Sequence, residues 1–200
     1  MTATPMRLLI TTMAMLSLAA CTIFPDRPAH QIFQLPAPEL QASPAAGIDS
    51  VLRVSTPLAV APVDSTRILV KPEAHEIQAY QGARWSNRAP VMIGNHLVEA
   101  FRQDGRLKTV VRDTSAVRSD MALMGDLTRF QAEYEDGNPV IHLQLDLQLV
   151  DERSRETIAS KRFTISHPAG EASVESVAEA FGRASNELAR QVVSWAADEL

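Results

Sequence analysis

Side chains able to act as acids, bases or nucleophiles come close together at two places in the sequence. His142 and Asp146 share the polar face of one predicted strand, and Asp64, Ser65 and His75 are near one another. A histidine with an acid and a hydroxyl is the combination that hydrolases use to activate a nucleophile. Sequence proximity of common residues is weak evidence, so a hydrolase stays an alternative. The favoured interpretation of the first group is an exposed sheet face, and a docking surface for a partner protein is the other.

We expect no metal site, no nucleotide site and no cofactor. None of the five histidines belongs to a HExxH or comparable metal-ligand pattern; they are His30, His75, His96, His142 and His167. The sequence also has no GxSxG elbow, no GxxxxGK[ST] loop and no GxGxxG after a predicted strand. The sequence therefore predicts no catalytic residue and a function other than catalysis.

The single cysteine, Cys21, follows a segment typical of an export signal. Arg7 precedes an uncharged stretch over residues 8–20, which is shorter and less apolar than the roughly 20 residues that span a bilayer. Leu18-Ala19-Ala20-Cys21 resembles the lipobox of bacterial lipoproteins, in which the cysteine thiol receives a diacylglyceryl group. We therefore predict a signal peptide over residues 1–20 and lipidation of Cys21. Two acyl chains on this residue would suffice to anchor the mature protein stably.

Two further inferences concern the mature chain. Thr22, rather than Asp, favours the outer membrane over retention at the inner one. Removal of Arg7 with the signal leaves 18 Lys and Arg against 24 Asp and Glu, a formal charge of −6. Nucleic acid is therefore not an expected partner.

The sequence predicts a tether followed by one domain. Five prolines punctuate residues 21–47, which have no sustained helical or strand period. Within them, residues 32–35 alternate apolar and polar and could dock as a short edge strand. Residues 48–200 are enough for a single core.

The periodicity of residues 48–200 predicts an α+β fold with a mostly antiparallel sheet. Short strands are expected near residues 52–55, 67–70 and 77–80, and a helix over 88–103 with Asn87 as N-cap and Gly105 after its end. A strand at 107–112 leads to a three-stranded meander, with a β-bulge near Thr128 or Arg129. An amphipathic helix that begins after Ser173 should cover the apolar face, so that both helices pack on one face of the sheet.

Tyr80, Arg84 and Trp85 form the most unusual segment of the predicted domain. Trp, Tyr and Arg are enriched in binding hot spots, so this segment is the candidate partner-binding site. The competing interpretation places Trp85 in the core or at the entry of the following helix, and Trp195 in the core.

The sequence resembles the PqiC-like auxiliary lipoproteins of MCE-type ABC lipid transport systems. The resemblance rests on Cys21 and on four segments: Phe33-Gln34-Leu35, Arg67-Ile68-Leu69-Val70, Tyr80 with Arg84-Trp85-Ser86, and Asp126-Leu127-Thr128-Arg129-Phe130 followed by Gln131 and Glu133. Phe33 and its neighbours replace the paired tyrosines expected near the mature N-terminus.

The resemblance implies a periplasmic lipoprotein tethered to the outer membrane. Its implied partners are an MCE-domain protein, an inner-membrane permease and an ATPase that together move lipids between membranes. Assembly into homo-oligomeric rings is also implied by the resemblance. A second class of function is a structural envelope lipoprotein of outer-membrane assembly or Tol-Pal type. The lipoprotein hydrolase is the third class.

Overall fold

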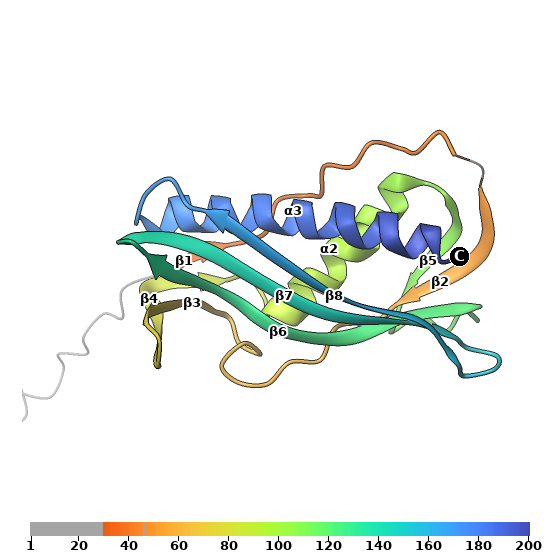
Figure 1. Ribbon diagram of the computed structural model, residues 1–200, viewed down its shortest axis with the longest axis horizontal. Coiled ribbons are helices and arrows are strands. Elements are labelled where there is room, and N and C mark those ends of the chain that lie inside the picture. Colours follow the sequence, from red (N-terminus) through yellow and green to blue (C-terminus); the bar gives the residue numbers. More distant parts are fainter. Residues whose placement is uncertain (1–29, 46) are drawn as a thin grey trace, which may run out of the picture.

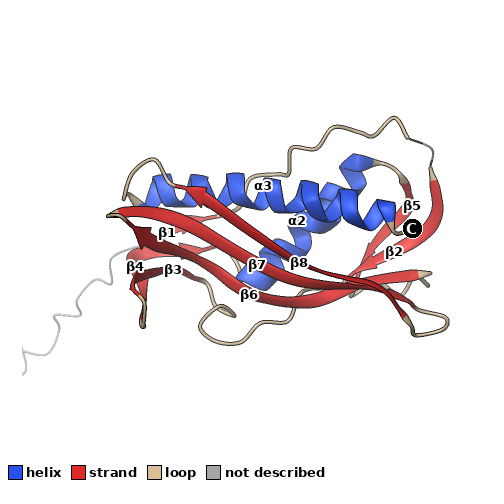
Figure 2. Ribbon diagram, viewed as in Figure 1, coloured by secondary structure: helices blue, strands red, loops and turns tan. Residues whose placement is uncertain are grey.

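The computed structural model describes residues 30–45 and 47–200, and the predicted signal peptide and Cys21 lie outside them. Within this part of the chain, eight strands form one sheet and two helices accompany it (Figures 1 and 2), which confirms the α+β class. The strands are β1 (Gln31–Phe33), β2 (Ile48–Val54), β3 (Arg67–Glu73), β4 (Glu76–Trp85), β5 (Leu107–Arg112), β6 (Met121–Glu135), β7 (Asn138–Asp151) and β8 (Thr157–Pro168). The helices are α2 (Ala89–Asp104) and α3 (Val174–Asp198).

The long strand β6 organises the sheet. One of its edges pairs with β7 in an antiparallel ladder, and β8 continues that antiparallel arrangement. Its other edge is shared by two shorter parallel strands, β2 beside Met121–Leu123 and β3 beside Ala132 and Glu133. With β1–β4 and β2–β5, four ladders are parallel, so the sheet is mixed where the sequence predicted a mostly antiparallel one. Each parallel partner comes from a distant part of the chain, which local periodicity does not specify.

The bulge expected near Thr128 or Arg129 is present in β6. Leu127 pairs with Leu145 and Arg129 with Gln144, so that Thr128 is the extra residue. A bulge reverses the face to which later side chains point. It is the reason that Leu127 and Phe130, three positions apart, are both buried in the core.

The helices begin and end close to the predicted positions. α2 starts after Arg88, one residue later than predicted, and its N-cap residue makes no side-chain cap. Gly105 ends α2 with φ 74°, a left-handed conformation that glycine adopts without a steric penalty. The Ser173 hydroxyl accepts a hydrogen bond from the Ser176 N–H at 3.3 Å and caps α3. α3 packs along β7 and β8, and α2 contacts α3 and β5.

Part of the segment predicted as a tether lies on the domain. β1 pairs in parallel with the end of β4, and residues 34–45, here called the strap, continue along α3 toward β2 (Figure 1). Pro36 packs so closely on α3 that a Cβ at Gly182 would be 2.8 Å from its ring, and the Ser43 N–H donates to the Asp104 carbonyl at 2.9 Å. The prolines interrupt secondary structure without preventing packing. Among the described residues, β1 and the strap thus pack on the domain that was predicted over residues 48–200.

Candidate functional site

The indole of Trp85 belongs to the core. Its side chain is 1% exposed, and its ring lies edge-on to Phe130 and Phe181, with centroids 5.7 and 5.1 Å away. Strand alternation then directs the side chain of Arg84 to the opposite face, where it is exposed. The ring of Trp85 therefore packs in the core, as the competing interpretation of the sequence placed it.

Tyr80 is half-buried at the edge of the same core. Burial, together with the neighbouring Tyr134 hydroxyl, raises the pKa of the Tyr80 hydroxyl above its usual range. Of the three predicted binding residues, only Arg84 is thus exposed.

Three of the segments that carry the family resemblance meet in this region. Phe33 of β1 is directly opposite Trp85 in the β1–β4 ladder, and the Ser86 N–H donates to the Phe33 carbonyl at 2.7 Å. Trp85 in turn contacts Phe130 of β6. These segments are far apart in sequence and share one packing cluster, so their residue types are explained by the core.

The polar residues on either side of Phe130 bind one another on the other face of β6. Glu133 accepts hydrogen bonds from Arg129 and, at 2.8 Å, from Gln131. Burial by itself would raise the pKa of Glu133, but these two donors outweigh it and lower the pKa. The three side chains therefore stabilise the strand locally.

His142 has different neighbours from those considered in the sequence. Its ring is buried in the sheet, with Nδ1 3.1 Å from the Ser166 hydroxyl and Nε2 2.8 Å from a Glu135 carboxylate oxygen. Ser65 instead donates to the Pro62 carbonyl. His142 and Asp146 do not meet, because residues four apart on one strand are about 13 Å apart. In the second grouping, Asp64 binds Arg88 rather than His75.

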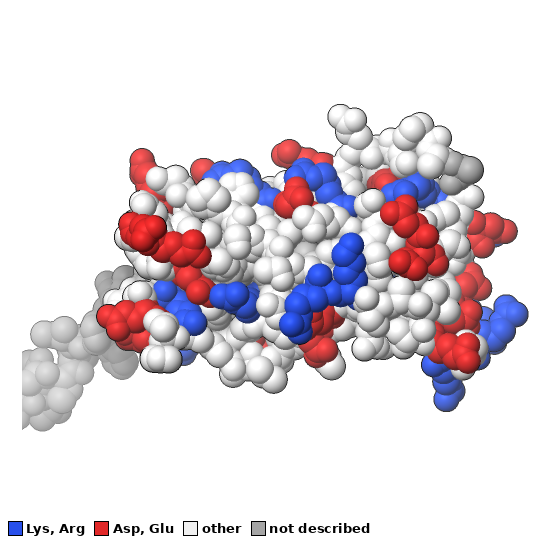
Figure 3. Space-filling view, viewed as in Figure 1, with Lys and Arg blue, Asp and Glu red and all other residues white. Residues whose placement is uncertain are grey.

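The described residues contain no group of three or more His, Cys, Asp or Glu side chains placed to hold a metal ion. None of their helices has the length and apolar character needed to cross a membrane. Figure 3 shows acidic and basic side chains interspersed with large uncharged areas on the face in view. That face therefore does not present an extended field of one sign.

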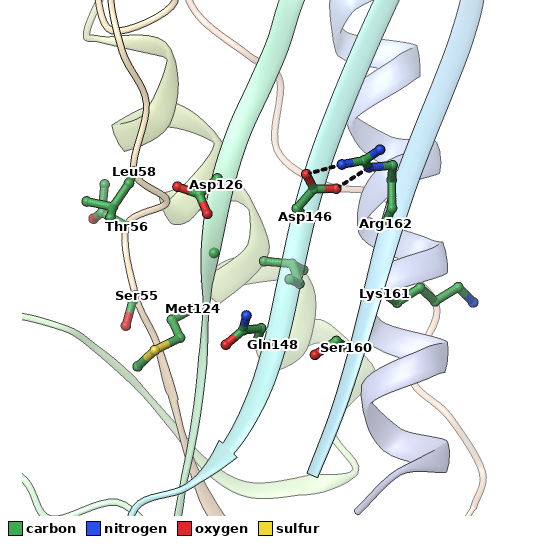
Figure 4. Close-up of a pocket in the computed structure, with 12 residues that line it drawn as sticks. Ser55, Thr56, Leu58, Met124, Asp126, Asp146, Gln148, Ser160, Lys161 and Arg162 are labelled. Atoms are coloured by element: carbon green, nitrogen blue, oxygen red, sulfur yellow. Dashed lines mark hydrogen bonds and ion pairs between the residues drawn. The ribbon is translucent and has the colours of Figure 1, made fainter. Parts of the chain in front are cut away.

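A groove of about 580 Å³ crosses the outer face of the sheet, on the side away from the helices (Figure 4). One wall is residues 55–58, which run along β6: the Leu58 N–H donates to the Gly125 carbonyl, and the Leu58 carbonyl accepts from the Leu127 N–H, both at 2.8 Å. Two large apolar side chains are exposed here, Leu58 at 72% and Met124 at 41%. Exposed apolar side chains gathered beside a hollow are typical of an interaction surface.

One acidic side chain of the groove, Asp126, has no ion-pair partner among the described residues. Asp126 and Asp146 are directly opposite each other on β6 and β7, an arrangement that is unfavourable for two like charges. Arg162 neutralises Asp146 through two hydrogen bonds of 2.6 and 2.8 Å, which lower the pKa of Asp146 (Figure 4). Among the described residues Asp126 has no ion-pair partner, and Lys161 directs its ammonium over the Phe163 ring instead. The groove can accept a Lys or Arg side chain beside an apolar one.

Sequence reasoning identified Asp146 as a polar-face residue and missed Leu58 and Asp126 as its neighbours. No local pattern could have found this neighbourhood, because residues 55–58 reach β6 through a non-local pairing.

The comparisons with known proteins agree with the resemblance inferred from the sequence. The model of the ABC-type transport auxiliary lipoprotein component family matches residues 33–193. Protein XCC0632 from Xanthomonas campestris has a crystal structure that is similar at a TM-score of 0.79 and 29% identity, over 84% of this chain and 95% of that one. Protein CT253 from Chlamydia trachomatis shares the fold at a TM-score of 0.52 and 10% identity, over 76% and 96% of the two chains. No curated protein matches the sequence. The family match extends from β1 into the last turns of α3, and the chain therefore belongs to the family of ABC-type transport auxiliary lipoprotein components.

Proposed function

We propose that this lipoprotein is a non-catalytic scaffold of an MCE-type ABC transporter, tethered to the outer membrane from the periplasmic side, and that it helps move lipids between membranes. The family match over residues 33–193 carries the proposal, because it covers nearly the whole folded domain. The residues add two supports: a lipobox-like sequence that ends at Cys21, and side chains of the proposed hydrolase groupings that bind other partners.

Replacing the lipidated residue should separate anchoring from folding. Cys21→Ser should abolish lipidation and move the protein from the membrane to the soluble fraction, because anchoring rests on the acyl chains. The variant should keep the thermal midpoint of the wild-type domain, since residue 21 precedes the family match and the described strands. Membrane fractionation, mass spectrometry of the N-terminus and a lipid-transport assay in cells would measure these effects. Normal transport by the soluble variant would show that tethering is not part of the function.

The groove on the outer sheet face is the surface that we assign to the transporter partner. Asp126→Lys and Leu58→Ser should each weaken co-purification with the MCE-domain protein of the proposed transporter by about tenfold, because central apolar and charged contacts dominate interface energies. Ile77→Ser is the matched control, since Ile77 is also exposed, at 45%, but lies on β4 outside the groove.

The result separates the proposed classes of function. Loss of binding in the two groove variants alone would support both the partner and its docking site. Equal binding by all variants would remove the groove from the proposal and keep the partner. Wild-type protein that binds no MCE-domain protein, and instead cross-links to a β-barrel or to peptidoglycan, would establish the structural envelope lipoprotein class.

A further inference from the structure

A row of three exposed side chains crosses the first strands of the domain. Ile32 of β1 pairs with Arg84 of β4, and Arg84 pairs with Arg67 of β3. Directly paired residues direct their side chains to the same face of a sheet. Ile32 is 61% exposed and both arginines are exposed, so the row presents one apolar and two cationic groups to the surroundings.

The pairing of the two arginines is unfavourable for the stability of the sheet. Like charges directly opposite each other destabilise a strand pair. Neither guanidinium has an ion-pair or hydrogen-bond partner among the described residues, whereas the nearby Arg88 binds both carboxylate oxygens of Asp64 at 2.8 Å. Local violations of this kind are expected where a ligand supplies the missing interaction. A guanidinium presents several N–H donors that match the oxygens of a phosphate group.

The position of the row in the chain indicates where that phosphate is found. Ile32 is eleven residues after Cys21. Eleven residues span at most about 40 Å even when fully extended. The end of the domain formed by β1, β3 and β4 is thus held within that distance of the anchor, while the β7–β8 hairpin lies at the opposite end (Figure 1).

We infer that the row formed by Ile32, Arg84 and Arg67 rests on the anionic membrane surface that holds the lipid anchor. The two guanidiniums bind lipid phosphates and Ile32 enters the headgroup layer, so that the domain has a fixed orientation on the membrane. The inference rests on the proposed lipidation of Cys21 and is independent of the transporter partner.

A spin label on the exposed Gln34 tests this contact. The mature lipidated protein has no free thiol, so Gln34→Cys introduces a single labelling site. On vesicles that contain phosphatidylglycerol, a label at residue 34 should be shielded from a water-soluble nickel chelate, and a label introduced by Ile158→Cys near the β7–β8 hairpin should stay accessible. On vesicles of phosphatidylcholine alone, shielding of residue 34 should be weaker.

Arg67 and Arg84 should account for the stronger shielding of residue 34 on vesicles that contain phosphatidylglycerol. Each Arg near an anionic leaflet contributes about fivefold to binding, so the double variant Arg67→Gln, Arg84→Gln should lower the equilibrium constant for the shielded state roughly 25-fold. Arg88→Gln is the matched control and should have little effect, because Asp64 already neutralises that guanidinium. The double variant should fold normally, since it removes a like-charge pair.

Three outcomes would overturn the inference: equal accessibility of residues 34 and 158, shielding that the double variant retains, or shielding that appears only when an MCE-domain protein is added. The last result would identify a protein-binding face. A mature chain with Cys21→Ser, held on the same vesicles by an N-terminal histidine tag and a lipid that chelates diamagnetic zinc, repeats the test without lipidation. Shielding in this form would support the contact even if Cys21 proved not to be acylated.

Discussion

Trp85→Ala should lower the free energy of unfolding by about 3–5 kcal/mol, the usual cost of removing a large aromatic side chain from a core. The indole is 1% exposed and lies edge-on to both Phe130 and Phe181, so its loss would leave a cavity between β4, β6 and α3. Urea unfolding of the wild type and the variant, followed by circular dichroism, would measure the difference.

Arg84→Ala is the natural control for this experiment. Arg84 is the neighbouring residue on β4, with its side chain exposed on the other face of the sheet. Its replacement should change the free energy of unfolding by no more than about 0.5 kcal/mol, as is usual at exposed positions. If Trp85→Ala were as stable as Arg84→Ala and still weakened binding of a partner, the hot-spot interpretation of Trp85 would replace the packing role.

Gly125→Ala should destabilise the protein by about 3 kcal/mol or more, at the upper end of the cost of overpacking. A Cβ built on Gly125 would collide with the Asp146 carbonyl oxygen and would be 2.8 Å from the carbonyl carbon. These are backbone atoms of the paired strand, so β6 and β7 would have to separate locally. Loss of stability on urea unfolding should be accompanied by faster amide exchange in the centre of the β6–β7 ladder.

Gly170→Ala supplies the comparison for a methyl group added without a clash. A Cβ on Gly170 would meet its nearest neighbour, the Ser176 hydroxyl, at 3.5 Å, an ordinary contact distance. Its stability should stay within about 0.5 kcal/mol of the wild type. A Gly125→Ala protein as stable as Gly170→Ala would mean that β6 and β7 are farther apart at this point than the structure places them.

The two proposed surfaces lie on different parts of the domain. The row of Ile32, Arg84 and Arg67 crosses β1, β4 and β3, whereas the groove beside Asp126 lies over β6, β7 and β8. They share no residue, so variants in one surface leave the side chains of the other unchanged.

Features that depend on near neighbours in the chain were predictable from the sequence. The strict alternation of β7 predicted its buried side, and Ile141, Leu143 and Leu145 are fully buried. The Ser173 cap, the glycine that ends α2 and the bulge at Thr128 were predictable for the same reason, since each is a property of a few consecutive residues. The family resemblance had a similar origin in short motifs.

The arrangement of distant segments was decided only by the tertiary structure. Local periodicity predicted strands near residues 52–55 and 67–70, but it contained nothing to show that both would pair with β6 in parallel. The docking of Pro36 on Gly182, the contact of His142 with Ser166 and the meeting of Leu58 with Asp126 likewise join residues from separate elements. The sequence by itself predicted most of the elements and the family, and Cys21 as the anchor residue stays a prediction. Which side chains share a surface followed from non-local pairing, because the energy of such contacts depends on partners that local periodicity does not identify.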